Sequence, residues 1–341
     1  MDKERELSLM APIKTTMMLL VVLYHSCVMW AGGGWFDYPV VSCGPLGVFA
    51  LWLNTFHVPM FVFASGYVHS YLRRETLHYG SASTVLVRKA RRLLLPCALV
   101  SLLWAAPIYG VFVGTENLAI KFLLMESPSQ LWFLPMLFWC FAITEFIWKF
   151  FRGLILQPDV RVFSAVALLA IGSPIVSKLT GGAFQLSSAC SYLILFYSGW
   201  VFRMGGTARF WTAGPLRFII ADLLLFAVWI MTDTAGGVAV SLAHRVVGIS
   251  LRLLGCAMVL SMAGRLRIPS IEIASTLERV SFGVYLFHQQ LVWIALSFLN
   301  IPDVPPIVAA LTAFIFSLSA SAVLTELLGR FGPTKLIIGK G

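Results

Sequence analysis

Apolar residues occur along this chain in long uninterrupted runs that are separated by short polar connections. A helix rises about 1.5 Å per residue, so crossing the hydrocarbon core of a bilayer takes about 20 residues. The runs are too long for barrel strands, and backbone groups in lipid must be hydrogen-bonded within the protein, so the predicted fold is all-α. The pattern predicts ten transmembrane helices, at residues 12–31, 44–72, 92–113, 131–150, 160–178, 184–203, 215–232, 245–263, 281–299 and 305–329.

The composition supports a membrane protein. Of the 341 residues, 59% are hydrophobic and only 12% are charged, which is far from the values of a soluble domain. The first apolar run is longer than a signal-peptide core and lacks a small-residue cleavage site, so we expect it to be retained as the first span. No stretch is left over for a soluble domain, and residues 1–341 are expected to form one transmembrane domain.

The distribution of positive charge predicts the orientation in the membrane. The formal charge of +10 could suggest a nucleic-acid partner, but the lysines and arginines lie in short runs between apolar segments. Connections on the N-terminal side hold 20 of them, whereas the opposite connections hold only Lys121, Lys178 and Arg245. By the positive-inside rule both termini are cytoplasmic, and we expect a multi-pass protein of the plasma membrane, the inner membrane in a bacterium.

The largest predicted cytoplasmic connection, 73–91, carries Arg73 and Arg74 at its start and a second group of positive charges at its end. Arg88, Arg91 and Arg92 precede the next apolar run. One interpretation is a positive-inside anchor at the ends of two helices. The other is that part of the cluster faces an inner vestibule and binds a phosphate-bearing donor, because arginine contacts phosphate oxygens in a bidentate manner. Both interpretations can hold together.

Three histidines lie well inside predicted spans, away from the span ends. His25 and His57 are each the fourteenth residue of their span, so they are expected at similar depth in adjacent helices, and His288 lies in the ninth span, followed by Gln289 and Gln290. Ionisable side chains at bilayer depth are costly and usually face a bundle interior or a wet cavity. The alternative is that each ring hydrogen-bonds a neighbouring helix without any catalytic role.

Other ionisable residues have no predicted partner. Arg252 is the most costly charge within a span and needs a partner or water. Three acidic residues lie on the inner halves of their helices, Asp222, Glu145 and Glu326. For these three, the sequence is as compatible with a structural salt bridge as with a catalytic role. The remaining histidines, His69, His78 and His244, lie near helix ends, where a wetted surface position is expected. The six cysteines lie singly, so neither a disulfide framework nor a metal site is predicted.

Buried histidine suits two kinds of chemistry. A neutral imidazole can take the proton of a hydroxyl as it attacks a carbonyl carbon, which is the central step of acyl transfer. Histidines also serve proton-coupled transport, so a transporter or flippase of a polysaccharide or lipid intermediate is the alternative. A non-catalytic scaffold is a third hypothesis. The spacing of the histidines does not separate these functions.

Five short motifs occur in order along the chain. They are Leu23-Tyr24-His25-Ser26, Phe56-His57-Val58-Pro59-Met60-Phe61 with Ser65-Gly66-Tyr67, Arg88 to Pro96, Leu131-Trp132-Phe133-Leu134, and Ser281-Phe282-Gly283-Val284-Tyr285-Leu286-Phe287-His288. In this order they resemble the motifs of the acyltransferase 3 family of integral-membrane acyltransferases, and most closely those of its fucose 4-O-acetylase-like branch. The resemblance extends from about residue 12 to 290, which is most of the chain.

The resemblance implies transfer of an acyl group, usually acetyl, from cytoplasmic acyl-CoA to a hydroxyl of a glycan or lipid-linked acceptor at the outer side. Acyl-CoA is then a co-substrate, with no tightly bound cofactor. By analogy His25 is the catalytic histidine, with His57 or His288 orienting it or stabilising the oxyanion. The arginines at 88, 91 and 92 face the CoA phosphates, and the segment 57–67 lines the central cavity.

The chain departs from the family pattern at two points. Lys14 stands where many members have arginine, which leaves a point charge in place of a bidentate phosphate contact. An extracytoplasmic hydrolase-like domain follows the last helix in some members, and this chain ends soon after Arg330. We therefore expect acyl groups to pass directly to the acceptor, or to a separate partner protein.

Overall fold

A computed structural model describes residues 3–31, 43–76, 79–114, 116–126, 128–205, 214–233, 237–265, 272–299 and 303–339. Across these residues the chain is helical and contains no β-strand. The long helices are α1 Lys3–Cys27, α3 His57–Arg74, α8 Phe133–Phe150, α9 Val160–Thr180, α10 Leu186–Met204, α12 Pro215–Asp233, α13 Val238–Ala263, α14 Glu272–Ser297 and α15 Pro306–Arg330. The shorter ones are α2 Gly44–Asn54, α4 Ala82–Lys89, α5 Leu95–Val100, α6 Ala106–Phe112 and α7 Leu118–Leu123.

Eight of the described helical segments are long and apolar enough to cross a membrane, which confirms an all-α polytopic membrane protein. They are Glu4–Ala31, Gly44–Arg74, Ala82–Phe112, Ser129–Phe150, Val160–Thr180, Pro215–Thr232, Val238–Ala263 and Pro306–Arg330. The other two predicted spans, 184–203 and 281–299, overlap α10 and α14, which are not among the eight. Ten spans and cytoplasmic termini stay predictions.

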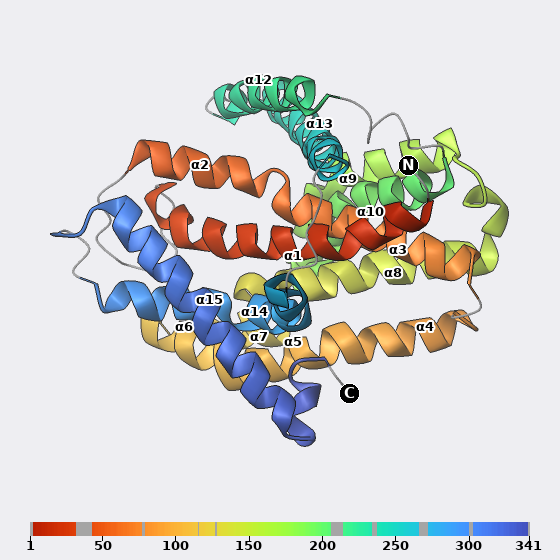
Figure 1. The fold of residues 1–341 in the computed structure, drawn as a ribbon. Helices are drawn as coiled ribbons and strands as arrows, with labels where there is room; N and C mark the ends of the chain where they lie inside the picture. The colour runs from red at the N-terminus through yellow and green to blue at the C-terminus, as the bar shows by residue number, and fades with distance from the viewer. Residues whose placement is uncertain are drawn as a thin grey trace.

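Helix α1 runs through the middle of the bundle (Figure 1). It contacts α2, α3, α14 and α15, while α3 packs along α10, and α10 packs on α9. Helices α14 and α15 form another packed pair. The pair α12 and α13 stands at one edge of the molecule (Figure 1), where α13 contacts α3 and α9. The central position of α1 brings residues from distant parts of the sequence around its histidine.

Two glycines allow α3 and α10 to approach with their backbones in contact. A Cβ atom on Gly66 would lie 2.0 Å from the carbonyl oxygen of Phe196, and one on Gly199 would lie 1.9 Å from that of Phe63. Either side chain would collide with backbone, so both positions require glycine. Small residues at helix crossings increase van der Waals contact, which drives helix association in lipid. The crossing fixes α3 as a rigid support for the residues at its N-terminus.

The third predicted span contains two widened turns, each placed just before a proline. Ala90–Leu94 and Ser101–Ala105 are π-helical, and Pro96 and Pro107 each follow two residues after a π segment. Proline has no N–H to donate and its ring crowds the carbonyl four residues earlier, so the preceding turn opens to longer-range bonding. The first widened turn carries Arg91 and Arg92.

The structure corrects four predicted helix starts: α13 begins at Val238 where residue 245 was predicted, α14 begins at Glu272 where residue 281 was predicted, and α1 and α4 also begin earlier. Helix α1 begins at Lys3 and continues through Pro12, whereas the prediction began at residue 12. Helix α4 begins at Ala82, capped by the Ser81 hydroxyl, which accepts a hydrogen bond from the Thr84 amide at 3.2 Å, whereas the third span was predicted from residue 92. Apolar runs mark the part of a helix in hydrocarbon, and these helices extend beyond that part.

Candidate active site

A cavity of about 410 Å³ lies within the bundle, between α1, α3, α6, α8, α10 and α14. His25 and His57 both line it, as do Tyr24, Tyr109 and Gln289. His25 occupies the last turn of α1, and His57 is the first residue of α3. The structure therefore brings two of the three predicted catalytic histidines to one polar cavity.

The third histidine, His288 on α14, completes a cluster of aromatic rings. The ring centroids of His25 and His288 are 4.8 Å apart, and the Tyr24 ring lies 4.9 Å from His25 and 5.0 Å from His57. All three histidines are buried, with His288 fully enclosed. Of the segment expected to line the cavity, His57 and Val58 do so, while Gly66 packs on α10 as described above.

A break in the second predicted span positions His57. The run 44–72 folds as two helices, α2 and α3, joined at Thr55 and Phe56. The Nδ1 atom of His57 lies 2.5 Å from the carbonyl oxygen of Leu53. A carbonyl only accepts, so Nδ1 carries the proton and the neutral ring keeps its lone pair on Nε2. The break thus fixes the tautomer of His57.

His288 has the same tautomer for the same reason. Its Nδ1 atom lies 3.1 Å from the carbonyl oxygen of Val284 and 2.8 Å from that of Tyr285, so Nδ1–H donates to its own helix. Its Nε2 atom is buried and makes no hydrogen bond within the described part of the chain. Nε2 is therefore an acceptor directed into the interior.

A glutamine pair fastens the short helix before α8 to α14. Gln130 Nε2 donates to Gln290 Oε1 at 2.7 Å and to the Leu286 carbonyl at 2.7 Å, and Gln290 Nε2 donates back to Gln130 Oε1 at 3.0 Å. The Tyr285 hydroxyl donates to the Gln130 carbonyl. Sequence reasoning noted Gln290 but missed Gln130, whose only signal was its place just before the Leu131-Trp132 motif.

Tyr109 on α6 is a further polar residue of the cavity that sequence reasoning missed. Lys121 Nζ donates to its hydroxyl oxygen at 2.9 Å and lies 4.8 Å from the centroid of its ring. The ammonium group occupies an acceptor position of the hydroxyl, which leaves the O–H proton available to another acceptor. Tyr109 can therefore offer a hydrogen bond to a group in the cavity.

The basic residues predicted to bind a donor come together from two helices. Lys14 on α1 and Arg92 in the first π turn are close enough to repel each other, and Lys89 experiences repulsion from both. Arg88 and Arg92 both act on Tyr79, in the connection before α4, and burial still raises the pKa of Tyr79 to about 12. Arg91 is exposed. We refer to Lys14, Arg88, Lys89, Arg91 and Arg92 as the basic cluster.

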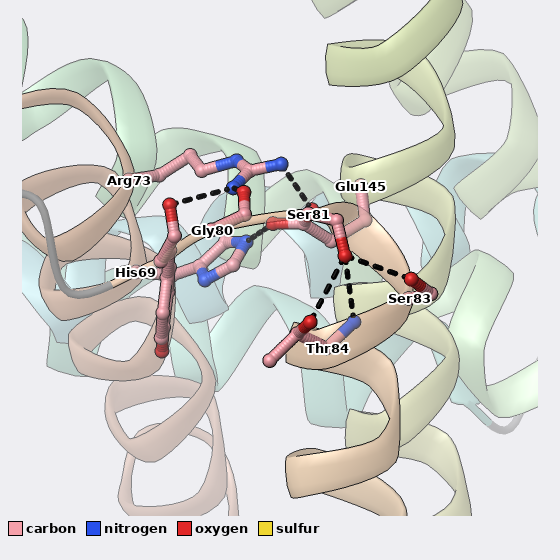
Figure 2. A network of polar contacts seen from close by, with 8 residues as sticks. His69, Arg73, Gly80, Ser81, Ser83, Thr84 and Glu145 are labelled. Carbon is pink, nitrogen blue, oxygen red and sulfur yellow. Dashed lines mark hydrogen bonds and ion pairs between the residues drawn. The ribbon is translucent and has the colours of Figure 1, made fainter.

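His69 is not the wetted surface residue that its position predicted. It is 1% exposed and lies 3.1 Å, Nε2 to Oε1, from the fully buried Glu145 of α8 (Figure 2). Arg73 Nη2 contacts Glu145 Oε2 at 2.8 Å, and Arg73 Nη1 donates to the Gly80 carbonyl at 2.7 Å (Figure 2). This group anchors the segment before α4, and so positions the start of the basic cluster. His78 lies outside the described residues.

The other ionisable residues have partners away from the cavity. Asp222 Oδ2 accepts from Trp52 Nε1 at 2.8 Å, and Glu326 pairs with Arg279 at 2.9 Å on an exposed face. His244, expected at the wet outer edge, is half-buried and stacks on Trp229 with ring centroids 5.0 Å apart. Among the described residues no three His, Cys, Asp or Glu side chains are grouped to hold a metal ion.

Comparison with known proteins gives one match. A family model described as an acyltransferase domain matches residues 13–326. No match was found among curated proteins or among solved structures. The matched region begins one residue before Lys14 and contains His25, His57 and His288 as well as the whole basic cluster.

Proposed function

This chain belongs to the acyltransferase 3 family of membrane acyltransferases, and on that premise we propose that it transfers an acetyl group from cytoplasmic acetyl-CoA to a hydroxyl of a saccharide or lipid-linked acceptor. The observation that carries this proposal is that His25 and His57 line one polar cavity of about 410 Å³, while the ring of His288 lies 4.8 Å from that of His25. The proposal includes the plasma membrane as the location of the enzyme and the outer side as the side on which the acceptor binds.

In the proposed reaction His25 is the general base. Its neutral imidazole takes the proton of the acceptor hydroxyl as that oxygen attacks the thioester carbonyl. A new C–O bond forms, the C–S bond breaks, and the imidazolium returns its proton to the departing CoA thiolate. The step balances without another reactant, since the acyl group moves from sulfur to oxygen and the proton moves, by way of His25, from oxygen to sulfur.

The fixed tautomers divide the supporting roles. While its ring is neutral, Nε2 of His288 can only accept a hydrogen bond. The ring centroid of His25 is 4.8 Å away, so His288 is suited to accept a hydrogen bond from an N–H of His25. In this role His288 orients the base. His57 Nε2 likewise accepts and suits another hydroxyl of the acceptor, because the reacting hydroxyl gives its proton to His25. The oxyanion needs a donor, and Tyr109 offers its O–H because Lys121 occupies an acceptor position of the hydroxyl. We therefore assign oxyanion stabilisation to Tyr109 rather than to a histidine.

The basic cluster is assigned to the phosphates of CoA. Mutual repulsion among Lys14, Lys89 and Arg92 is unfavourable in the absence of an anion and is relieved when a polyanion binds. Arg88, Arg91 and Arg92 are exposed, so they are open to a soluble donor. Lys14, on the same helix as His25, links the donor site to the catalytic cavity.

The test is acetyl transfer by the purified protein in liposomes. Labelled acetyl-CoA and a lipid and glycan extract are supplied, and labelled product is measured by chromatography and mass spectrometry. His25→Ala is expected to lower transfer by about a hundred- to ten-thousand-fold, because general-base catalysis is lost. Cys27→Ala, a buried substitution two residues further along and outside the cavity, serves as the control.

Two results would contradict the proposal. One is a His25→Ala protein that inserts normally and transfers acetyl at the wild-type rate. The other is movement of an unmodified polysaccharide or lipid intermediate across the membrane without consumption of acetyl-CoA, which is the result that a transporter predicts.

A further inference from the structure

A second cavity, of about 330 Å³, lies between α9, α10, α12 and α13. Its polar wall comes mainly from one face of α13, where Ser241, His244, Arg245 and Arg252 line it, and Trp229 of α12 stands opposite. The proposed reaction uses none of these residues. We call this cavity the arginine pocket. On the predicted orientation it opens toward the outer surface, the side on which the acceptor is proposed to bind.

Helical geometry aims both arginines into the pocket. Arg245 and Arg252 are seven residues apart, which is two turns and about 10 Å along α13, so they share one face. Gly248 lies between them on that face, and a Cβ atom there would lie 3.1 Å from Trp229 Nε1. The absence of a side chain at Gly248 lets the indole pack between the two arginines without filling the space they line.

The pocket has an excess of positive charge. None of its described lining residues is acidic, and within the described part of the chain neither Arg245 nor Arg252 forms an ion pair. Arg252 Nη1 donates to the Ser191 hydroxyl at 3.2 Å, a neutral partner that does not balance its charge. An arginine within a span is costly unless a counter-charge or water meets it, so the pocket is suited to an anion.

Tyr192 connects the arginine pocket with the catalytic cavity. The guanidinium carbon of Arg252 lies 5.0 Å from the centroid of the Tyr192 ring, and the same tyrosine lines the cavity of His25, next to Trp132 at 5.6 Å between centroids. A ligand held by Arg252 therefore lies next to the cavity in which the acceptor hydroxyl would react.

We propose that the arginine pocket binds an acidic group of the acceptor, a carboxylate or phosphate on a saccharide unit, and thereby positions a neighbouring hydroxyl for acylation. This inference rests on the proposed acyltransferase function and narrows its acceptor class to anionic saccharides. Arg252 supplies the inner contact and Arg245 the contact at the rim, with the Ser241 hydroxyl as a further hydrogen-bonding group for the sugar. The volume of about 330 Å³ suits a single sugar unit.

The experiment measures binding and transfer separately in the full-length protein. In nanodiscs of phosphatidylcholine, binding of glucuronic acid and glucose 1-phosphate is compared with binding of glucose, and acetyl-CoA binding is measured in the same samples. We expect at least one acidic sugar to bind more tightly than glucose. Arg252→Gln is expected to weaken that binding about ten- to hundred-fold, because a hydrogen-bonded charge contact is lost, while acetyl-CoA binding is unchanged.

Two further variants separate recognition from folding. Arg245→Gln removes an exposed rim charge and tests the same prediction if Arg252→Gln does not fold. Arg217→Gln, an exposed arginine at the other end of α12 and outside the pocket, is the matched control and should bind acidic sugars as the wild type does. Equal binding of acidic and neutral sugars, or acidic binding that is unchanged in both pocket variants, would overturn the proposal.

A lipid headgroup is the other source of such an anion, and a parallel measurement distinguishes it. If phosphatidylglycerol is retained through Arg245 and Arg252 while no acidic sugar binds, the pocket is a lipid site and the acceptor proposal is wrong. If acidic sugars bind through the arginines but no acetyl leaves acetyl-CoA, the pocket proposal stands and the acyltransferase mechanism fails. Failure of the two proposals is thus distinguishable.

Discussion

The molecule contains two buried histidine sites that differ in what surrounds the ring. Around His25 the Nδ1 atoms of His57 and His288 donate to carbonyls of their own chain segments, and Nε2 is left as an acceptor. At the other site His69 is held at Nε2 by Glu145, which Arg73 also contacts. The site at the cavity keeps a basic nitrogen available, whereas at the other site His69 serves to hold neighbouring segments together.

This difference shows that burial alone does not identify a catalytic histidine. His69 is as buried as His57, each being 1% exposed, yet its carboxylate and guanidinium partners belong to a closed ion-pair group. A backbone carbonyl, by contrast, fixes the tautomer without neutralising or occupying the second nitrogen. The atom that remains available for chemistry therefore distinguishes the two sites.

The largest expected effect is on stability, at the closed site. Glu145→Ala leaves Arg73 and His69 buried without their carboxylate, and breaking a buried ion pair in this way costs about 3–5 kcal/mol. Thermal unfolding in detergent should show a large fall for Glu145→Ala and little change for His25→Ala. Glu326→Ala breaks the exposed pair with Arg279 and should cost about 0–1 kcal/mol. Equal losses for the two glutamates would remove the distinction between the sites.

A smaller effect is expected at His288, and it is on catalysis. Asparagine retains a donor near the Nδ1 position but has no atom at Nε2, whereas glutamine places an amide near Nε2. If His288 orients His25 through Nε2, His288→Asn should lower the rate about ten- to hundred-fold, by loss of a buried hydrogen bond, and His288→Gln should lower it less. Both rates are normalised to folded protein. A lower rate for His288→Gln than for His288→Asn would indicate that His288 acts through the contacts of Nδ1 with backbone carbonyls and not through Nε2.

The smallest effect is expected in the basic cluster. Arg92→Gln removes one of several charges, so the KM for acetyl-CoA should rise only several-fold to about ten-fold, with kcat nearly unchanged, because the lost contact acts on binding. The increase should diminish at high salt, which screens exposed charges. Arg330→Gln, an exposed arginine outside the cluster, is the control. A fall in kcat at constant KM would place Arg92 in the chemical step instead.

Hydropathy determined most of the helices, because lipid imposes a length and a polarity on every span. The positions of His25 and His57 at matching depth also followed from counting along the runs, and the structure places both on one cavity. The break before His57 did not follow, since an apolar run has the same hydropathy whether it folds as one helix or as two. It depends on how Thr55, Phe56 and Leu53 pack and bond locally.

By itself, then, the sequence determined that this is an all-α membrane protein of the acyltransferase 3 family with ionisable groups at bilayer depth. Only the tertiary structure decided which of those groups meet: His25 with His288, His69 with Glu145, and Arg252 with Tyr192. The reason is physical. Lipid requires each span to be apolar, so the composition of a span is enough to identify it. Contacts between spans depend on how helices rotate and cross, which the sequence of a single span does not determine.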